Sequence, residues 1–415
     1  MTAVHSRAVG ANLKDMLSEA KDSSELMVDL AYAALFFSDA GMADEVHELE
    51  DRLRDLTHQM RETCVLAARS PREAEQMSGV LQLVSAIERM ANAAVDVSRI
   101  VTRRLGIPAA LVADLAAAEE VSHRVRIRDD SAMAHRSLAD LELPIETGMR
   151  VVAIRRGKQW VIDPDGDEVL VPDDILILRG PVDGIAELRV LAGAPEWRAP
   201  ALEEDPALSD LDRAVDVLVE MKNVSEVAVG LAYSALLFDD QGLAAEVSQL
   251  EERLDEMRER LELWVLRAAS ETIDPSPLRG LLHLGGAAEE IGDAAQQMVW
   301  VVEQGEEMHP VLVAALGESD EVIARIPVGA GSLLEGRTLS EVSLETETGF
   351  YLLAIRRSGR WSYRPRGGFR LAAGDELVGS GPDEGRARLA ELCGYRVIED
   401  DDTGQVDLVP AAGPR

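Results

Sequence analysis

Lysine and cysteine are scarce in this chain of 415 residues, and each scarcity narrows what the protein can be. The two cysteines, Cys64 and Cys393, lie far apart and fit no metal-binding spacing, so we expect no structural disulfide and a reducing compartment. Only four of the 42 basic residues are lysine, against 76 acidic residues, and the net charge is -34. Lysine-poor acidity is typical of proteins in concentrated salt, where ions screen self-repulsion. We therefore expect a halophilic source; an ordinary acidic cytosolic protein is the alternative.

Long apolar runs are also absent, and so are the signatures of several protein classes. No run approaches the roughly 20 residues that cross a bilayer, and no stretch resembles a signal peptide, which predicts a cytoplasmic protein without direct membrane insertion. The strong negative charge argues against nucleic acid as a partner. The seven histidines and two cysteines form no recognisable catalytic constellation, so we do not expect an enzyme.

The sequence repeats itself at a spacing of 201 residues. The segment DLAYAALFFSDAGMADEVHELEDRL, which begins at Asp29, recurs as GLAYSALLFDDQGLAAEVSQLEERL from Gly230. The same spacing relates Lys21 to Lys222. A repeat this long indicates a duplicated unit of two modules, because solenoid repeats have periods of roughly 20–50 residues.

Each copy begins with helices and ends with strands. Apolar residues recur at spacings of three and four over residues 12–37 and 42–68, and a third helix is predicted from Pro71 to about Arg104. Short connections between long amphipathic helices indicate an antiparallel bundle. The later part, MRVVAIRRGKQWVIDPDGDEVLVPDDILILRG, alternates short β-branched runs with turn residues. The predicted fold class is a multidomain α and α+β chain, in which two three-helix antiparallel bundles alternate with two small α+β domains, each a β-sheet plus short helices.

Both modules resemble known families. LAYAALFF…ADEVHELEDRLRDL with AIERMANAA, and LAYSALLF…AAEVSQLEERLDEM with AEEIGDAA, resemble the PhoU family of phosphate-signalling helical bundles. SLADLELPIETGMRVVAIRRG and TLSEVSLETETGFYLLAIRRSG, with the strands that follow them, resemble the RCK C-terminal domain, also called the TrkA C-terminal domain. The predicted domains are PhoU-like bundles at residues 1–110 and 211–310, RCK C-terminal-like domains at 111–195 and 311–396, a linker at 196–210 and an acidic tail at 397–415.

The RCK C-terminal resemblance implies control of potassium channels and of Trk- or Ktr-type transporters, in which this domain binds a small ligand at a dimer interface. The chain has neither a channel segment nor a GxGxxG loop after a strand. The resemblance therefore implies a regulatory subunit or sensor for a separately encoded membrane potassium channel or transporter, located in the cytoplasm or peripherally at the membrane through that partner. Together with the acidic composition, it predicts a haloarchaeal protein. Two copies predict pairing, as an internal pseudo-dimer or in a homo-oligomer. The alternatives are a PhoU-like regulator of phosphate signalling or transport, and a metal-storing or metal-sensing bundle.

The PhoU resemblance also implies a metal site. Bundles of this family hold metal with acid-x-x-x-acid pairs on facing helices, and the second copy has Glu251 with Asp255 and Glu289 with Asp293. Carboxylates at i and i+4 share a helix face, so we expect a divalent metal in the second bundle, with Mg²⁺, Mn²⁺, iron and Zn²⁺ all compatible with oxygen ligands. The alternative is a solvated acidic face, which is common in so acidic a chain.

The first copy departs from this pattern. Its equivalent positions hold Glu50 with Arg54, and Glu88 with Asn92. A guanidinium in place of a carboxylate would neutralise the cluster, so we predict an ion pair between Arg54 and Glu88 where the second copy holds a cation.

In each copy, one pair of arginines ends a predicted strand, and both pairs are candidates to bind a small anionic ligand. They are Arg155, Arg156, Arg356 and Arg357. Guanidinium groups bind phosphate in a fork, and successive strand residues point to opposite faces, so one arginine of each pair would face the ligand. The family resemblance suggests cyclic di-AMP or another nucleotide. Surface arginines in ordinary ion pairs are the alternative.

Overall fold

The protein is described by a computed structural model that covers residues 12–116, 120–197, 209–271, 274–305, 308–317, 321–363, 365–399 and 406–411. The chain divides into two compact units, and each unit combines segments from both copies of the repeat. The helical unit comprises Met1–Pro108 and Leu208–Ser319, and the sheet unit comprises Ala109–Ala207 and Asp320–Arg415. The two helical modules therefore form one unit and the two sheet modules form the other, rather than each copy of the repeat forming a unit of its own.

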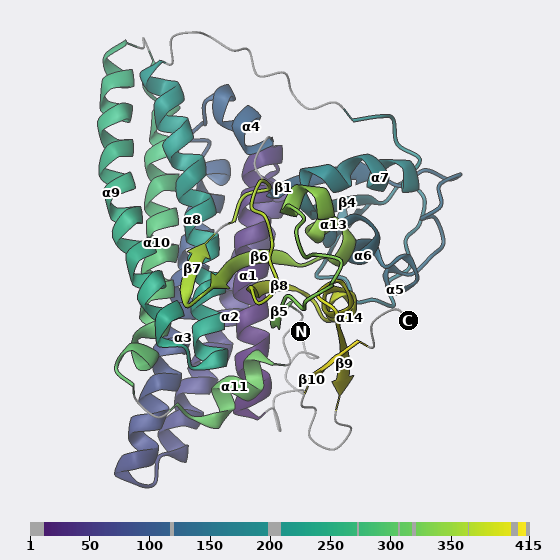
Figure 1. Cartoon of the computed structure of the whole chain (residues 1–415). Helices are drawn as coiled ribbons and strands as arrows, with labels where there is room; N and C mark the ends of the chain where they lie inside the picture. The colour runs from purple at the N-terminus through teal and green to yellow at the C-terminus, as the bar shows by residue number, and fades with distance from the viewer. Residues whose placement is uncertain are drawn as a thin grey trace, which may run out of the picture. The chain divides into compact units, whose positions relative to one another are not determined.

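Two bundles of three long helices form the helical unit, which confirms the predicted bundle architecture (Figure 1). The first copy supplies α1 (Leu13–Phe37), α2 (Ala40–Ala67) and α3 (Pro71–Thr102). The second copy supplies α8 (Asp210–Phe238), α9 (Gln241–Glu271) and α10 (Leu278–Glu303), followed by the short α11 (Pro310–Leu316).

Capping residues determine where these helices begin and end. Asn12 accepts a hydrogen bond from the backbone N–H of Asp15, and Ser70 accepts one from Glu73 just ahead of the proline that opens α3. Between α1 and α2, Ser38 adopts a left-handed conformation (φ 51°), and the Asp39 side chain then caps α2. Each cap satisfies a donor that the first helical turn leaves unpaired.

The two bundles pack against each other mainly through α3 and α10, and their contacts are reciprocal. The ammonium group of Lys21 lies 5.1 Å from the ring centre of Tyr233, and that of Lys222 lies 5.3 Å from the ring centre of Tyr32. Both members of the second contact are related to the first by the repeat spacing. Such exchange of equivalent residues is the property of a two-fold interface, so the bundles are paired about a pseudo-two-fold axis.

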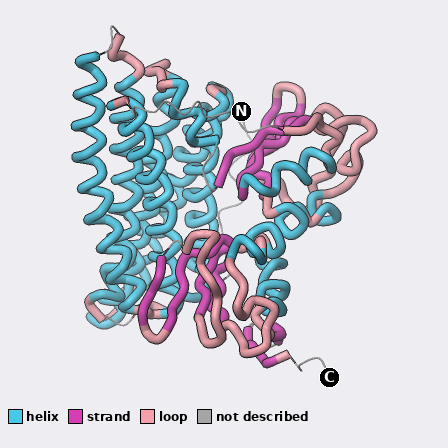
Figure 2. Tube along the Cα trace, turned by 45° about the horizontal axis from the view of Figure 1, so that its top comes forward, coloured by secondary structure: helices cyan, strands magenta, loops and turns pink. Residues whose placement is uncertain are grey.

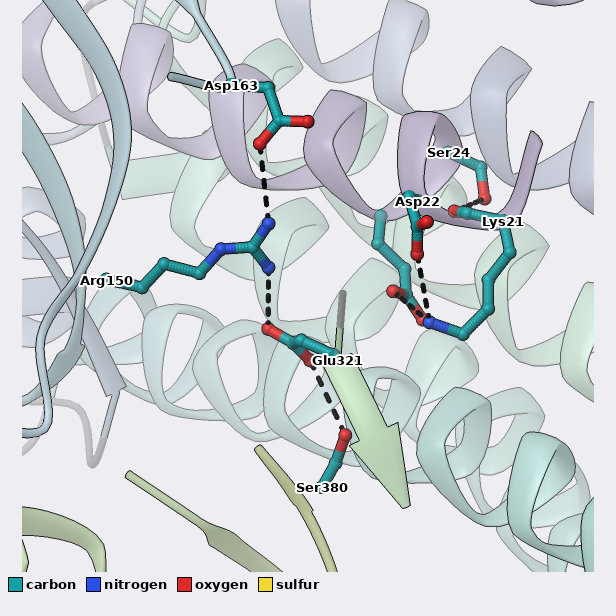
Figure 3. A network of polar contacts seen from close by, with 8 residues as sticks. Lys21, Asp22, Ser24, Arg150, Asp163, Glu321 and Ser380 are labelled. Atoms are coloured by element: carbon teal, nitrogen blue, oxygen red, sulfur yellow. Dashed lines mark hydrogen bonds and ion pairs between the residues drawn. The ribbon is translucent and has the colours of Figure 1, made fainter. Parts of the chain in front are cut away.

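Both buried lysines also have a carboxylate partner on their own helix. Lys21 pairs with Glu25 at 2.7 Å and with Asp22 at 3.5 Å (Figure 3), and Lys222 pairs with Glu226 at 2.8 Å. A buried ammonium group requires such compensation, because an unpaired charge removed from water is strongly destabilising.

The sheet unit holds two antiparallel four-stranded sheets with short helices, which Figure 2 shows in magenta and cyan. The strand orders are β1-β4-β2-β3 and β5-β8-β6-β7. The first copy supplies α4 (Ala109–Ala116), β1 (Glu120–Arg126), α5 (Leu138–Leu141), α6 (Leu143–Thr147), β2 (Arg150–Arg156), β3 (Gln159–Ile162), β4 (Ile175–Pro181), the 3-10 turn η1 (Val182–Gly184) and α7 (Ile185–Leu191). The second supplies β5 (Glu321–Pro327), α12 (Leu339–Val342), α13 (Leu344–Thr348), β6 (Tyr351–Arg357), β7 (Arg360–Tyr363), β8 (Glu376–Pro382) and α14 (Asp383–Leu392).

The two sheet domains are paired through the short helices α6 and α13. Gly148 and Gly349 end these helices with φ of +71° and +70°. A Cβ on Gly148 would lie 3.1 Å from the carbonyl oxygen of Glu345, and one on Gly349 would lie 2.8 Å from that of Pro144. These contacts are again reciprocal. An ion pair between Arg150 and Glu321, at 3.0 Å, also joins the two domains (Figure 3).

The segment that we assigned to an acidic tail contains regular structure. Strands β9 (Tyr395–Glu399) and β10 (Val406–Pro410) form an antiparallel pair. Tyr395, Val397 and Leu408 pack against the core of the second sheet domain. This pair is not evident in the sequence, because acidic residues separate the two short apolar runs. Residues 198–208 of the predicted linker lie outside the described residues.

Close approach at the α6–α13 contact gives a prediction for Gly349→Ala. The added methyl group would crowd the carbonyl oxygen of Pro144, so we expect the free energy of unfolding to fall by about 2 kcal/mol. The left-handed backbone adds a further loss of about 1 kcal/mol. Gly359→Ala is the matched control, since Gly359 has a φ of +79° and a Cβ added there would meet nothing within 4 Å. Chemical unfolding of both variants measures the difference, and equal losses would contradict close packing at this contact.

Candidate functional site

A cluster of carboxylates lies between α9 and α10 of the second bundle. Ligand oxygens of Glu251, Asp255 and Asp293 all lie within 4.8 Å of one another. Glycines on α10 allow the two helices to approach closely, because a Cβ on Gly292 would collide with the side chain of Leu254. The structure thus brings together three of the four residues that the sequence pointed to.

The fourth residue, Glu289, is directed elsewhere. Its carboxylate pairs with Arg258 of α9. The equivalent glutamate of the first bundle, Glu88, is bound by Arg61 of α2, with Nη1 donating to Oε1 at 2.6 Å. One arginine therefore holds this glutamate in each bundle, although Arg61 lies one helical turn beyond the position that matches Arg258.

The predicted Arg54–Glu88 ion pair is wrong. Arg54 is 62% exposed and pairs with Glu50 and Asp51 on its own helix. Arg54 reaches these partners, three and four residues away, without turning toward the neighbouring helix. The carboxylate of Glu88 is already bound by Arg61. Comparison of the two copies missed Arg61, because its counterpart in the second copy is Glu262.

The carboxylate cluster has a local excess of negative charge. Burial and the nearby carboxylates of Asp255 and Asp293 raise the pKa of Glu251 above its usual value. The Gln296 amide donates to Glu251 at 3.1 Å. Arg89, which comes from α3 of the first bundle, pairs with Asp293. The donor set consists of oxygens and suits a hard or borderline divalent cation.

The second arginine of each predicted anion-binding pair is engaged with a buried aspartate. Arg156 donates from Nε and Nη2 to the two oxygens of Asp174, at 3.0 and 2.8 Å. Arg357 makes the same two-pronged contact with Asp375, at 2.6 and 2.5 Å. Hydrogen bonding to Asp174 raises the pKa of Arg156 above its usual value. The first pair ties the end of β2 to the turn before β4, and the second ties the end of β6 to the turn before β8.

The first arginine of each pair lies beside a tryptophan. Arg155 lies 5.9 Å from the ring centre of Trp160, and Arg356 lies 5.4 Å from that of Trp361. The surroundings then differ between the copies. Glu376 pairs with Arg356 at 2.5 Å, whereas the equivalent position of the first copy is Ile175.

The buried Arg156–Asp174 contact gives a prediction for Asp174→Asn. Asp174 is 1% exposed and also accepts a hydrogen bond from the backbone of Val171. Removal of its charge weakens the two-pronged contact, but Arg156 is 38% exposed and keeps its pair with Glu168 at 2.8 Å. We therefore expect the free energy of unfolding to fall by about 1.5 kcal/mol. Asp173→Asn is the control, because Asp173 is exposed and its pair with Arg126 contributes little. Similar losses for the two variants in chemical unfolding would refute the assigned role.

Sequence comparison matches the PhoU domain at residues 17–101 and 218–301, and the TrkA-C domain at residues 123–193 and 323–394. Over 69 residues the chain is 41% identical to the Ktr system potassium uptake protein C of Bacillus subtilis (strain 168). That match covers 16% of this chain and 31% of the relative, so the chain spans less than a third of its length.

Structure comparison adds distant similarities. A crystal structure of PhoU from Pseudomonas aeruginosa is similar over 71% of this chain and 96% of its own, with 16% identity and a TM-score of 0.39. The GsuK RCK domain is similar over 75% of this chain and 78% of its own, with 13% identity and a TM-score of 0.18. Within the described residues, no helix combines the length and the apolar character needed to cross a membrane.

Proposed function

The chain carries PhoU domains and TrkA-C domains in tandem, each present twice, and we propose that it is a non-enzymatic cytoplasmic regulator of a separately encoded potassium channel or transporter. The observation that carries this proposal is the pairing of the two TrkA-C domains through α6 and α13 within one chain. The similarity to a Ktr potassium uptake protein supports the same assignment. A regulator of this kind would pass a ligand-dependent change in the pair to its membrane partner.

The regulatory ligand in this proposal is a small anion held by the sheet unit. The first arginine of each pair, Arg155 or Arg356, lies beside a tryptophan and is the candidate to bind it. In the second copy, Arg356 shares the carboxylate of Glu376 with Arg325. An arginine beside an aromatic ring can bind a phosphate and stack a base.

Arg155→Ala and Arg356→Ala test this ligand. We expect cyclic di-AMP to bind the full-length protein, and Arg155→Ala to weaken the binding about tenfold or more, the loss of one charge-assisted contact. Arg356→Ala should weaken the binding by a comparable factor, because Arg356 lies beside Trp361 as Arg155 lies beside Trp160. Isothermal titration calorimetry, with ATP and phosphate as comparison ligands, measures all three proteins. If the folded wild-type protein does not bind cyclic di-AMP, that ligand is excluded. If both variants bind it with unchanged affinity, the arginines do not form the site.

The second bundle is the proposed site of a divalent cation. Glu251, Asp255 and Asp293 would supply the oxygen ligands, and Glu289, which is held by Arg258, would support the site from the adjacent turn. The ion would offset the charge that raises the pKa of Glu251. Because protons compete for a carboxylate with a raised pKa, metal affinity should fall as the pH falls toward that pKa.

A Mn²⁺ titration of the full-length protein tests this site. We expect Asp255→Asn to weaken binding about tenfold or more, because a charged ligand is lost. Glu256→Gln is the control. Glu256 follows Asp255 on α9, is exposed, and forms an i,i+4 acidic pair with Glu252 that lies outside the cluster. If the two substitutions have the same effect, the acids form a solvated face rather than a site.

A phosphate-signalling role is the second candidate, and the two matches to the PhoU domain are the observation that favours it. The two roles differ in their membrane partner. Co-purification with a potassium transport subunit supports the first role, and co-purification with a phosphate transporter or its sensor kinase supports the second.

A further inference from the structure

One charged contact lies at the pseudo-two-fold axis that relates the two bundles. Arg89 of α3 donates from Nε to Glu290 of α10 at 2.7 Å, and its Nη2 pairs with Asp293. Residues 89 and 290 are separated by the repeat spacing, so they occupy the same position in the two copies. Equivalent residues that contact each other lie at the axis itself.

The charge at this position is reversed between the copies. In a pair of identical bundles, a residue at the axis faces its own copy, so a charged residue there would meet a like charge. Here an arginine faces a glutamate. The neighbouring position differs in the same direction, because Asp293 of the second copy corresponds to Asn92 of the first. The second bundle thus carries the acids, and the first carries the base.

The cation–π contacts between the bundles do not have this directionality. Lys21 with Tyr233 and Lys222 with Tyr32 are the same contact in both directions. Two first bundles, or two second bundles, could form it equally well.

If two bundles of the first-copy type were paired, Arg89 would have no acid opposite it. The adjacent Glu88 is already held by Arg61 of its own bundle. Two first bundles would therefore bring together two partly buried guanidinium groups without a carboxylate between them. Two second bundles would bring together two glutamates and two aspartates. Either pairing desolvates like charges, which is unfavourable at an interface.

We propose that Arg89 makes the bundle interface specific, so that the α3 surface of the first copy accepts the acidic α10 surface of the second copy and rejects a copy of itself. The discriminating element is repulsive as well as attractive. The two halves of the repeat are consequently not interchangeable at this surface, although their folds are the same.

Charge swaps in the full-length protein test the proposal. Arg89→Glu makes the two copies alike and acidic, Glu290→Arg makes them alike and basic, and the double variant restores opposite charges in the reverse order. We expect each single change to lower the thermal midpoint of the helical signal in circular dichroism by about 5 °C or more at about 0.15 M salt. The double variant should recover most of that loss. Arg89→Gln removes the ion pair without adding repulsion, so it should lower the thermal midpoint by an intermediate amount. It replaces a charge-reversal variant that does not fold.

Arg99→Glu is the matched control. Arg99 lies on the same helix, is exposed, and forms its ion pair with Asp96 of its own helix rather than with the other bundle. It should shift the midpoint by about 1 °C or less. Raising the salt concentration should shrink the losses at position 89, because screening weakens charge repulsion but not packing. The proposal is overturned if Arg89→Glu costs no more than Arg99→Glu, or if the double variant is no more stable than the less stable single variant.

Discussion

Pairing of equivalent elements about a pseudo-two-fold axis is the constraint on which each unit depends. In the helical unit, α3 packs on α10, and each buried lysine reaches a tyrosine of the other bundle. In the sheet unit, α6 packs on α13 so closely that two glycines are needed. A cation–π contact is worth only about 0.5–2 kcal/mol. These contacts add to the packing of α3 on α10, and the partners share one chain and are therefore at high effective concentration.

The two copies share their framework and differ in charge. Both keep a buried aspartate gripped by the second arginine of the strand, as in Arg156 with Asp174. Loss of the arginine would leave the buried aspartate without its countercharge, which is strongly destabilising. Differences are found where side chains are more exposed, as with Arg54 in place of Asp255 and Ile175 in place of Glu376. The duplicated chain can thus give its two copies different binding properties on the same fold.

Lysine is used sparingly and in a particular environment. Two of the four lysines, Lys21 and Lys222, are buried at equivalent positions, each between a carboxylate of its own helix and an aromatic ring of the other bundle. A compact ammonium group fits between two such partners, whereas a planar guanidinium needs a wider, forked set of acceptors. In a chain whose other basic residues are mostly arginine, these two positions retain lysine for a packing reason.

The sequence by itself determined the repeat, the three-helix bundles and the sheet domains, because local periodicity and the spacing of the two copies are displayed directly by a single chain. The resemblance to PhoU bundles pointed to the three acids that form the carboxylate cluster. Only the tertiary structure decided the partners of the charged side chains. Arg61, not Arg54, holds Glu88, because the reach of a side chain across two packed helices depends on their relative rotation. The contact of Arg89 with Glu290 was likewise invisible in the sequence, since a residue and its own repeat counterpart become neighbours only when the two copies fold around a common axis.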